Sequence, residues 1–405
     1  MPRGPRIALY GHDTFGLGHL RRNLTLAHRL ARDFPTAHLL ALTGSPQMHA
    51  LPLPPRFDFV KIPSATKDAA GAYKARSLDL SLGELTDLRS RIIAEALLSY
   101  NPDLVLVDHA PSGMAGELIE PLARLRAANP SVRLVLGLRD IIDEPERVRA
   151  DWAAADLLSW MDQTYDRVFI YGVPGVGPSP EEYGLSQRLN GRVRYTGYVL
   201  WAEPGATRLQ VRARLGMAGE DRLVVATVGG GGDGDAILSS LLDGFAANGD
   251  GATQLVVVSG PLMAGAATRV LRAKADANPN ARLLEFEPDL PALVAAADCV
   301  VSMAGYNSMT EILAAGTPAV VVPRVEPRLE QWIRATAMER LGLCTVVHPA
   351  DATPGRLAEA VAGALAARRR ITPLPFPVDG AARVSAEVGA LLAEPREQSV
   401  RAIVA

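Results

Sequence analysis

The sequence predicts an α/β fold with two doubly wound, Rossmann-like domains in tandem. Three observations predict it. Short apolar runs alternate with longer helical patterns along the chain, the runs are almost continuously Val, Leu and Ile, and one irregular stretch near Ala202 interrupts the alternation. Runs of this kind are typical of parallel strands that are buried on both faces. A length of 405 residues also exceeds what one hydrophobic core usually serves.

The first expected domain covers residues 1–201, the second covers residues 202–372, and residues 373–405 form a Pro-rich link and a last helix that can cross back to the first domain. In the first domain we expect helices at Leu20–Phe34 and Leu82–Tyr100 and strands at Arg6–Gly11, His38–Thr43, Phe57–Ile62, Asp103–Asp108, Arg133–Leu138 and Arg167–Gly172. In the second we expect strands at Arg222–Val228, Thr253–Gly260, Ala281–Phe286, Asp298–Met303, Pro318–Pro323 and Leu343–His348.

Composition narrows the class of protein. The formal net charge of −2 provides no basic excess for a nucleic-acid partner. Apolar runs are too short to span a bilayer, and the N-terminus has no apolar core for a signal peptide. The two cysteines, Cys299 and Cys344, lie in apolar runs and suit free thiols in a reducing compartment. We therefore expect a cytoplasmic protein.

A run of glycines opens the second domain directly after its first strand. The segment "VVATVGGGGDGD" places Gly229, Gly230, Gly231, Gly232 and Asp233 between that strand and a helix. Glycines let a backbone approach a ligand closely, and a helix N-terminus offers N–H donors to an anion, so the loop suits a diphosphate. The spacing is neither the Rossmann fingerprint nor a P-loop. A plain tight turn is the alternative, although four consecutive glycines cost chain entropy.

Two further segments follow later strands. In "SMAGYNSMTEILAAG", Ala304 and Gly305 turn the chain, Asn307 or Ser308 can cap the next helix, and Glu311 lies one turn inside it. A carboxylate there can accept hydrogen bonds from the two hydroxyls of a ribose, or it merely complements the helix dipole.

In "VPRVEPRLEQWIRA", Glu330 and Gln331 stand near a helix start. An adjacent acid and amide can form hydrogen bonds with sugar hydroxyls. The alternative is that both are ordinary solvated residues of the helix.

These three segments, in this order, resemble the donor domain of GT-B glycosyltransferases. The resemblance is closest to the family 28-like group around the bacterial lipid-linked N-acetylglucosaminyltransferase, and to uncharacterised predicted glycosyltransferases that share "HDTFGLGHLRR" and "GYNSMTEILAAGTPAVVVPR". It implies two domains facing a deep cleft, a uridine diphosphate sugar as donor, a hydroxyl acceptor in polysaccharide or glycoconjugate biosynthesis, and no cofactor or metal ion.

The resemblance also implies roles for single residues. Glu311 matches the acid that binds the ribose hydroxyls, and the Gly229–Asp233 loop matches the one that holds the diphosphate. Glu330 and Gln331 fall where the family places two amides that read the donor sugar. The backbone at Phe286 and Glu287 corresponds to the part that recognises the base.

Three departures from the family pattern remain. Glu330 is an acid instead of an amide, so the donor sugar can differ. The family's phosphate-binding arginine near the interdomain strand has no clear counterpart in "TGYVLWAEP". Retaining enzymes often carry a paired-glutamate signature in the area of Glu330, so we expect inversion but leave retention open.

The first domain is expected to hold the catalytic base. Gly16 and Gly18 keep the turn in "DTFGLGHLRR" slim, and His19 follows at the start of a helix whose positive end favours a neutral imidazole. A neutral imidazole is a competent general base, and Asp108, at another strand exit, can orient it. The alternative is that His19 caps or packs the helix.

Residues directly after other strands of the first domain are expected to lie near His19. His109 and Arg139 are candidate acceptor-binding residues, although Arg139 can equally pair with Asp140. Arg22 most simply solvates its helix, or it binds an anionic acceptor. The long link Pro63–Leu80 is a candidate acceptor loop.

Three alternatives stay open. A nucleotide-sugar hydrolase would use His19 to activate water. A UDP-sugar 2-epimerase would need further acids in the first domain, where Asp108 and Glu117 are the plausible ones. A non-catalytic subunit would bind the nucleotide sugar without turnover. A lipid-linked acceptor would bring the protein to a membrane surface, and no nucleic-acid partner is expected.

Overall fold

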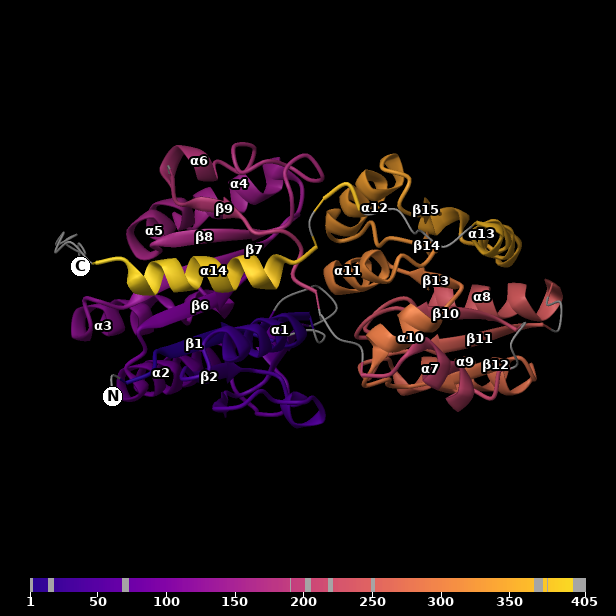
Figure 1. The fold of residues 1–405 in the computed structure, drawn as a ribbon, viewed down its shortest axis with the longest axis horizontal. Helices are drawn as coiled ribbons and strands as arrows, with labels where there is room; N and C mark the ends of the chain where they lie inside the picture. Colours follow the sequence, from indigo (N-terminus) through magenta and orange to yellow (C-terminus); the bar gives the residue numbers. More distant parts are fainter. Residues whose placement is uncertain are drawn as a thin grey trace. The chain divides into compact units, whose positions relative to one another are not determined.

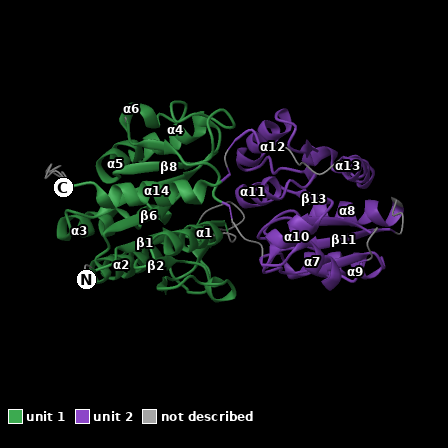
Figure 2. Cartoon of the chain, viewed as in Figure 1, with its two compact units in different colours: residues 1–199, 379–405 green, residues 200–378 purple. Residues whose placement is uncertain are grey.

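The computed structural model describes residues 3–13, 18–67, 73–189, 191–200, 205–217, 221–248, 252–367, 374–376 and 378–395. The chain divides into two compact units (Figure 2): unit 1 comprises residues 1–199 and 379–405, and unit 2 comprises residues 200–378. Gly16 and the expected boundary after residue 201 lie outside the described residues.

Unit 1 is built on a seven-stranded parallel sheet with the order β3-β2-β1-β6-β7-β8-β9 (Figure 1). Its strands are β1 (Arg6–Gly11), β2 (His38–Thr43), β3 (Phe57–Lys61), β6 (Leu104–Asp108), β7 (Arg133–Arg139), β8 (Arg167–Tyr171) and β9 (Val193–Tyr195). Its helices are α1 (Gly18–Asp33), α2 (Leu82–Tyr100), α3 (Ile119–Ala128), α4 (Pro145–Ala154), α5 (Leu157–Thr164), α6 (Leu185–Arg188) and α14 (Gly380–Ala393), with 3₁₀ turns η1 (Met48–Ala50) and η2 (Met114–Gly116). The expected acceptor loop contains an antiparallel pair, β4 (Ala65–Lys67) and β5 (Tyr73–Ala75).

Unit 2 is built on a six-stranded parallel sheet with the order β12-β11-β10-β13-β14-β15. Its strands are β10 (Arg222–Thr227), β11 (Thr253–Val258), β12 (Ala281–Leu284), β13 (Cys299–Ser302), β14 (Ala319–Val321) and β15 (Thr345–Val346). Its helices are α7 (Arg208–Arg214), α8 (Asp235–Asn248), α9 (Gly265–Asp276), α10 (Leu290–Ala296), α11 (Tyr306–Ala315), α12 (Glu330–Arg340) and α13 (Pro354–Ala366), with the 3₁₀ turn η3 (Pro349–Asp351).

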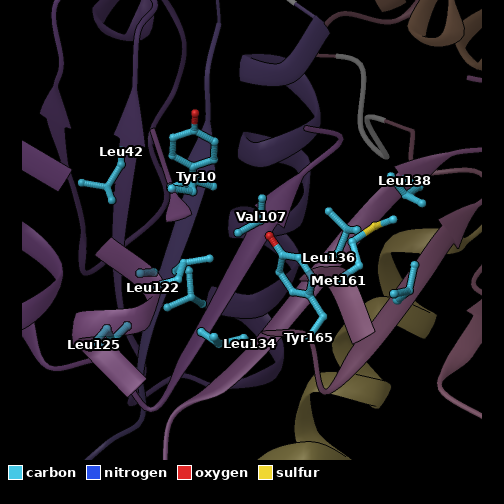
Figure 3. Packing of buried hydrophobic residues seen from close by; sticks show 14 of the residues in the cluster. Tyr10, Leu42, Val107, Leu122, Leu125, Leu134, Leu136, Leu138, Met161 and Tyr165 are labelled. Carbon is cyan, nitrogen blue, oxygen red and sulfur yellow. The ribbon is translucent and has the colours of Figure 1, made fainter. Parts of the chain in front are cut away.

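The alternation of side chains along the strands builds the core of unit 1. Leu134, Leu136 and Leu138 of β7 point to one face because successive strand residues alternate between faces. They belong to one buried cluster with Val107 of β6 and Tyr10 of β1 (Figure 3). The intervening strand residues are buried too, which explains why these strands read as continuous apolar runs.

Local signals set the helix ends where they are strong. Helix α2 begins with a capping box, in which the Ser81 side chain and Glu84 satisfy each other's backbone N–H groups, and it ends at Asn101 in the left-handed conformation. Its observed bounds equal the expected Leu82–Tyr100. Strand β9 was not predicted, because three residues with alternating exposure carry little apolar signal.

The last helix, α14, belongs to unit 1, where it lies beside α1 (Figure 1). The Gly380 N–H donates to the Tyr198 carbonyl at 2.9 Å, so the chain returns along the segment where it left unit 1. At the other end of the helix, Arg167 pairs with Glu394 at 3.2 Å, and Arg133 donates to the Glu394 carbonyl. The two strands β7 and β8 thereby hold the end of α14.

Candidate functional site

The strand order reverses once in each sheet. In unit 1 the reversal lies between β1 and β6, and in unit 2 it lies between β10 and β13. Loops at the carboxyl ends of such strands leave in opposite directions, and ligands of doubly wound sheets bind there. Most segments with predicted functional residues follow these strands or their direct neighbours, and the segment with Phe286 and Glu287 follows β12 at the edge of its sheet.

His19 and Asp108 meet at the reversal point of unit 1. Asp108 is the last residue of β6, and His19 lies in the first turn of α1, whose first residue is Gly18. The His19 Nδ1 atom lies 2.6 Å from Asp108 Oδ2. The Asp108 side chain is fully buried, and the His19 side chain is 13% exposed. The carboxylate therefore holds the Nδ1 side of the imidazole, and the His19 side chain keeps a small exposed fraction.

The Asp108 carboxylate is held in its ionised form. Burial by itself raises the pKa of Asp108, but the charge of Arg22 and the hydrogen bond from His19 outweigh it and hold that pKa well below its ordinary value. An ionised carboxylate can only accept, so the proton of a neutral His19 lies on Nδ1. Nε2 then carries the lone pair that a general base needs, which is the logic of a Ser-His-Asp site.

The expectation that Arg22 solvates its helix is wrong, because the side chain is buried. It is 3% exposed, and its Nε and Nη2 atoms donate to the two oxygens of Asp108, each at 2.7 Å. The helical spacing of His19 and Arg22 places both on the side of α1 that faces β6. Arg22 therefore fixes the carboxylate that in turn fixes His19.

Two residues at the exit of β1 were not singled out from the sequence. The His12 ring lies 4.3 Å from the His19 ring, and the Asp13 carboxylate accepts a hydrogen bond from Thr43. Asp13 has a positive φ of 45° and is 4% exposed. Burial raises the pKa of Asp13 to about 6, against the opposing effects of His19 and Thr43. The signal that points to them is their position directly after the first strand.

His109 and Arg139 form a second pair beside this site. The Arg139 Nη2 atom lies 2.7 Å from His109 Nε2, and because a guanidinium only donates, this nitrogen accepts. Burial and, next to it, the charge of Arg139 hold the pKa of His109 well below its ordinary value, so His109 is neutral. Its ring lies 5.8 Å from that of His19. The structure thus gives Arg139 a histidine partner that the sequence pattern does not indicate.

Glu117 belongs to a buried network of its own. The Arg89 guanidinium donates to both oxygens of Glu117, at 2.5 and 2.7 Å, and the Tyr10 hydroxyl also donates to the carboxylate. Both side chains of the ion pair are fully buried. Arg89 additionally donates to the backbone carbonyls of Pro63 and His12. The acid expected for an epimerase is therefore occupied in tying α2 to β1 and to the start of the acceptor loop.

The glycine loop of unit 2 lies against the loop after β11. Gly231 has a φ of +84°, and a Cβ there would lie 2.2 Å from the Ser259 carbonyl oxygen. Gly260 faces the loop in the same way, with its Cβ position 2.5 Å from the Gly229 carbonyl oxygen. Gly229, with a φ of +67°, has no atom within 4 Å of its Cβ position, so the loop is open on that side. Gly230, Gly232 and Asp233 complete the turn before α8.

The segment after β13 differs from the expectation at its cap. Ala304 has a φ of +60°, Gly305 is the N-cap of α11 without a side-chain hydrogen bond, and Asn307 and Ser308 lie inside the first turn. The prediction that Asn307 or Ser308 caps the helix is wrong, because Gly305 is the N-cap and the helix already begins at Tyr306. Glu311 lies in the following turn and is 8% exposed.

Glu330 and Gln331 begin α12 and are both buried. The Gln331 Oε1 atom accepts from the Arg324 backbone N–H at 2.9 Å. The Arg324 guanidinium pairs with Glu330 at 3.4 Å and with Asp233 of the glycine loop at 3.1 Å. Arg324 was not among the predicted site residues, yet it links three predicted ones.

The segment after β12 is held by structural contacts. Glu287 is 6% exposed, and its carboxylate accepts from Arg214 of α7 at 2.9 Å and from the Asp289 N–H at 3.1 Å. Phe286 beside it is half-buried. The contacts use the Glu287 side chain and leave the prediction about the backbone as it stands.

Within the described ranges, His, Cys, Asp and Glu side chains form no group of three or more that could hold a metal ion. None of the helices described is both long enough and apolar enough to cross a membrane.

The two doubly wound units define the GT-B class of fold. The chain superposes on the calicheamicin glycosyltransferase with a TM-score of 0.61 and 17% identity, over 96% of this chain and 99% of that one. The UDP-GlcNAc 2-epimerase of Methanocaldococcus jannaschii gives a TM-score of 0.59 and 13% identity, over 95% of this chain and 99% of that one. At these identities the likeness shows the fold alone, and the predicted fold class is confirmed.

Sequence relatives narrow the likeness. Residues 225–373 match the model of the glycosyltransferase family 28 C-terminal domain. The UDP-N-acetylglucosamine–N-acetylmuramyl-(pentapeptide) pyrophosphoryl-undecaprenol N-acetylglucosamine transferase of Sorangium cellulosum is 31% identical over 252 residues, which are 57% of this chain and 62% of that protein. The match spans less than two thirds of that relative's length. The predicted resemblance to the family 28 group is confirmed.

Proposed function

We propose that this chain is a glycosyltransferase that moves a sugar from a nucleotide diphosphate donor, a UDP-sugar, to a hydroxyl group of an acceptor. The observation that carries the proposal is the buried Arg22–Asp108–His19 arrangement at the strand-order reversal of unit 1, with 2.6 Å between His19 Nδ1 and Asp108 Oδ2. The family 28 match of residues 225–373 supports a nucleotide-sugar donor. The name of the Sorangium relative includes UDP-N-acetylglucosamine, a sugar nucleotide of this class.

His19 is the proposed general base. Its Nε2 takes the proton of the acceptor hydroxyl while the oxygen forms a bond to the anomeric carbon of the sugar. The bond from that carbon to the phosphate oxygen breaks, and its electron pair leaves with the diphosphate, so the anomeric configuration inverts. Asp108 stabilises the imidazolium that forms, and Arg22 holds Asp108 in place.

Unit 2 is the proposed donor side. The Gly229–Asp233 loop and the start of α8 bind the diphosphate, and Glu311 binds the ribose hydroxyls. Glu330 and Gln331 bind the hydroxyls of the donor sugar, and the backbone at Phe286 and Glu287 binds the base. Loop N–H groups and the helix dipole stabilise the charge of the leaving diphosphate, so the proposed step requires neither a metal ion nor another cofactor.

One observation separates this proposal from the 2-epimerase alternative. An epimerase needs an additional acid or base, and Glu117 has both carboxylate oxygens engaged by Arg89 and is fully buried. A hydrolase would use the same His19–Asp108 pair on water, so release of free sugar without any acceptor is the result that would favour it. Nucleotide binding without turnover, unchanged by replacing His19, would favour a non-catalytic subunit.

The first experiment is a thermal-shift screen against UDP, GDP, dTDP, ADP and CMP, with Glu311→Ala beside the natural chain. We expect stabilisation by UDP that the Glu311→Ala variant loses. The second is turnover of UDP-sugars with lipid-linked, polysaccharide and small-molecule acceptors. His19→Gln is expected to lower kcat by about 10²–10⁴-fold and to leave UDP affinity unchanged. A natural chain that responds to no nucleotide would refute the proposal.

A further inference from the structure

Arg324 lies between the glycine loop and the start of α12. It follows β14, the strand next to β13, and its side chain is 26% exposed. Its Nη1 atom lies 3.1 Å from Asp233 Oδ2, and its Nη2 atom lies 3.4 Å from Glu330 Oε1. All of these residues belong to unit 2. A single side chain therefore spans the distance from the diphosphate loop to the sugar-reading pair.

The glycine loop by itself carries the wrong charge for an anion. Asp233 stands inside it, and Asp235 is the first residue of α8. The loop N–H groups and the helix dipole attract a diphosphate, but two carboxylates at the same helix start oppose it. A cation beside the loop offsets these charges and favours an anion there. Among the described residues, the cation paired with the loop is Arg324.

The Arg324 guanidinium also has donor capacity left. Its ion pairs with Asp233 and Glu330 use one nitrogen each, and the Nε–H is buried without an acceptor among the described residues. A guanidinium presents its N–H groups in a planar fork that matches the oxygens of a phosphate. A buried donor without an acceptor is uncommon in folded proteins, and an arriving phosphate oxygen would supply one.

We propose that Arg324 is the cation of the diphosphate site, that Asp233 holds it in place in the absence of ligand, and that the nucleoside diphosphate takes it over on binding. The inference rests on the proposed function, since it deepens the donor site of unit 2. It assigns opposite effects to the two partners of one ion pair. Arg324 favours the diphosphate directly, whereas Asp233 competes with it for the guanidinium and repels it.

The test measures the affinity of the full chain for UDP, UMP and uridine by titration calorimetry. Arg324→Gln is expected to weaken UDP binding by about tenfold or more, to weaken UMP binding less, and to leave uridine binding unchanged. Asp233→Asn is expected to tighten UDP binding, by roughly threefold or more, because it removes a like charge and releases the guanidinium. Arg328→Gln, which removes another cation from the same segment, is the control and leaves the affinities unchanged.

Two results would overturn the inference and leave the proposed function standing. One is an equal loss of UDP and uridine affinity in Arg324→Gln, which would show that the side chain only supports the fold of the site. The other is a loss of UDP affinity in Asp233→Asn as large as that in Arg324→Gln, which would show that the intact ion pair is what the ligand needs. A natural chain that binds no UDP would instead refute the donor site itself.

Discussion

Asp108→Asn tests the catalytic arrangement most directly, because this substitution keeps the shape of the side chain and removes its charge. Asp108 accepts from His19 at 2.6 Å and from Arg22 at 2.7 Å through each oxygen. The Arg22 side chain is 2% exposed, so the variant leaves a buried guanidinium without its counter-charge. Breaking a buried pair in this way costs about 3–5 kcal/mol. The remaining amide oxygen accepts one hydrogen bond, so we expect about 3 kcal/mol, at the lower end of that range.

The effect on catalysis follows from the tautomer of His19. If the amide nitrogen of the substituted side chain faces His19, it donates to Nδ1, the ring proton moves to Nε2, and the base loses its lone pair on the acceptor side. A wrong tautomer at such a site lowers kcat by about 10⁴-fold. UDP affinity, which depends on unit 2, is expected to stay unchanged.

The assay combines urea unfolding, kcat for the folded fraction and UDP affinity, with Asp87→Asn as the control, since Asp87 is an exposed acid on α2. The pH dependence has a definite sign. Since the folded-state pKa of Asp108 is lowered, its contribution to stability is full at neutral pH and is lost as the pH falls below about 4, and the variant lacks this loss. An Asp108→Asn protein with the natural kcat would refute the role given to the pair.

Three further outcomes are expected. The folded-state pKa of Asp13 is raised from 3.8 to about 6, so its contribution to stability is lost as the pH rises through 6. Relative to Asp13→Asn, urea unfolding should find the natural chain about 1 kcal/mol less stable at pH 8 than at pH 5. An equal pH dependence of the two proteins would contradict this. Gly231→Ala should weaken UDP binding and lower stability by more than Gly229→Ala does, because only a Cβ at Gly231 would clash with a carbonyl oxygen, at 2.2 Å. Equal losses in the two variants would show that backbone strain alone matters. Glu117→Gln should lower the free energy of unfolding by about 3 kcal/mol, because the buried Arg89 loses its counter-charge, while kcat of the folded fraction stays near the natural value. A selective loss of kcat would give Glu117 a chemical role instead.

Much of the fold was readable from the sequence because its signals are local. Each of the twelve expected strand segments overlaps an observed strand, and α2 has its predicted bounds, since apolar runs and a capping box act within a few residues. The same holds for the positions of His19 and the glycine loop directly after strands. The cap of α11 was missed because Gly305 has no side chain to mark an N-cap, whereas Asn307 and Ser308, residue types that often cap helices, lie inside the first turn.

Partnerships between distant residues were decided by the tertiary structure alone. Arg22 is 86 residues from Asp108, and Arg324 is 91 residues from Asp233. These pairs exist because β1 lies beside β6, and β10 lies next but one to β14 with only β13 between them. Strand order depends on which apolar faces the helices cover together, a property of the whole sheet. The sequence by itself determined which strand exits carry chemical groups, and only the folded sheets decided which of those groups meet.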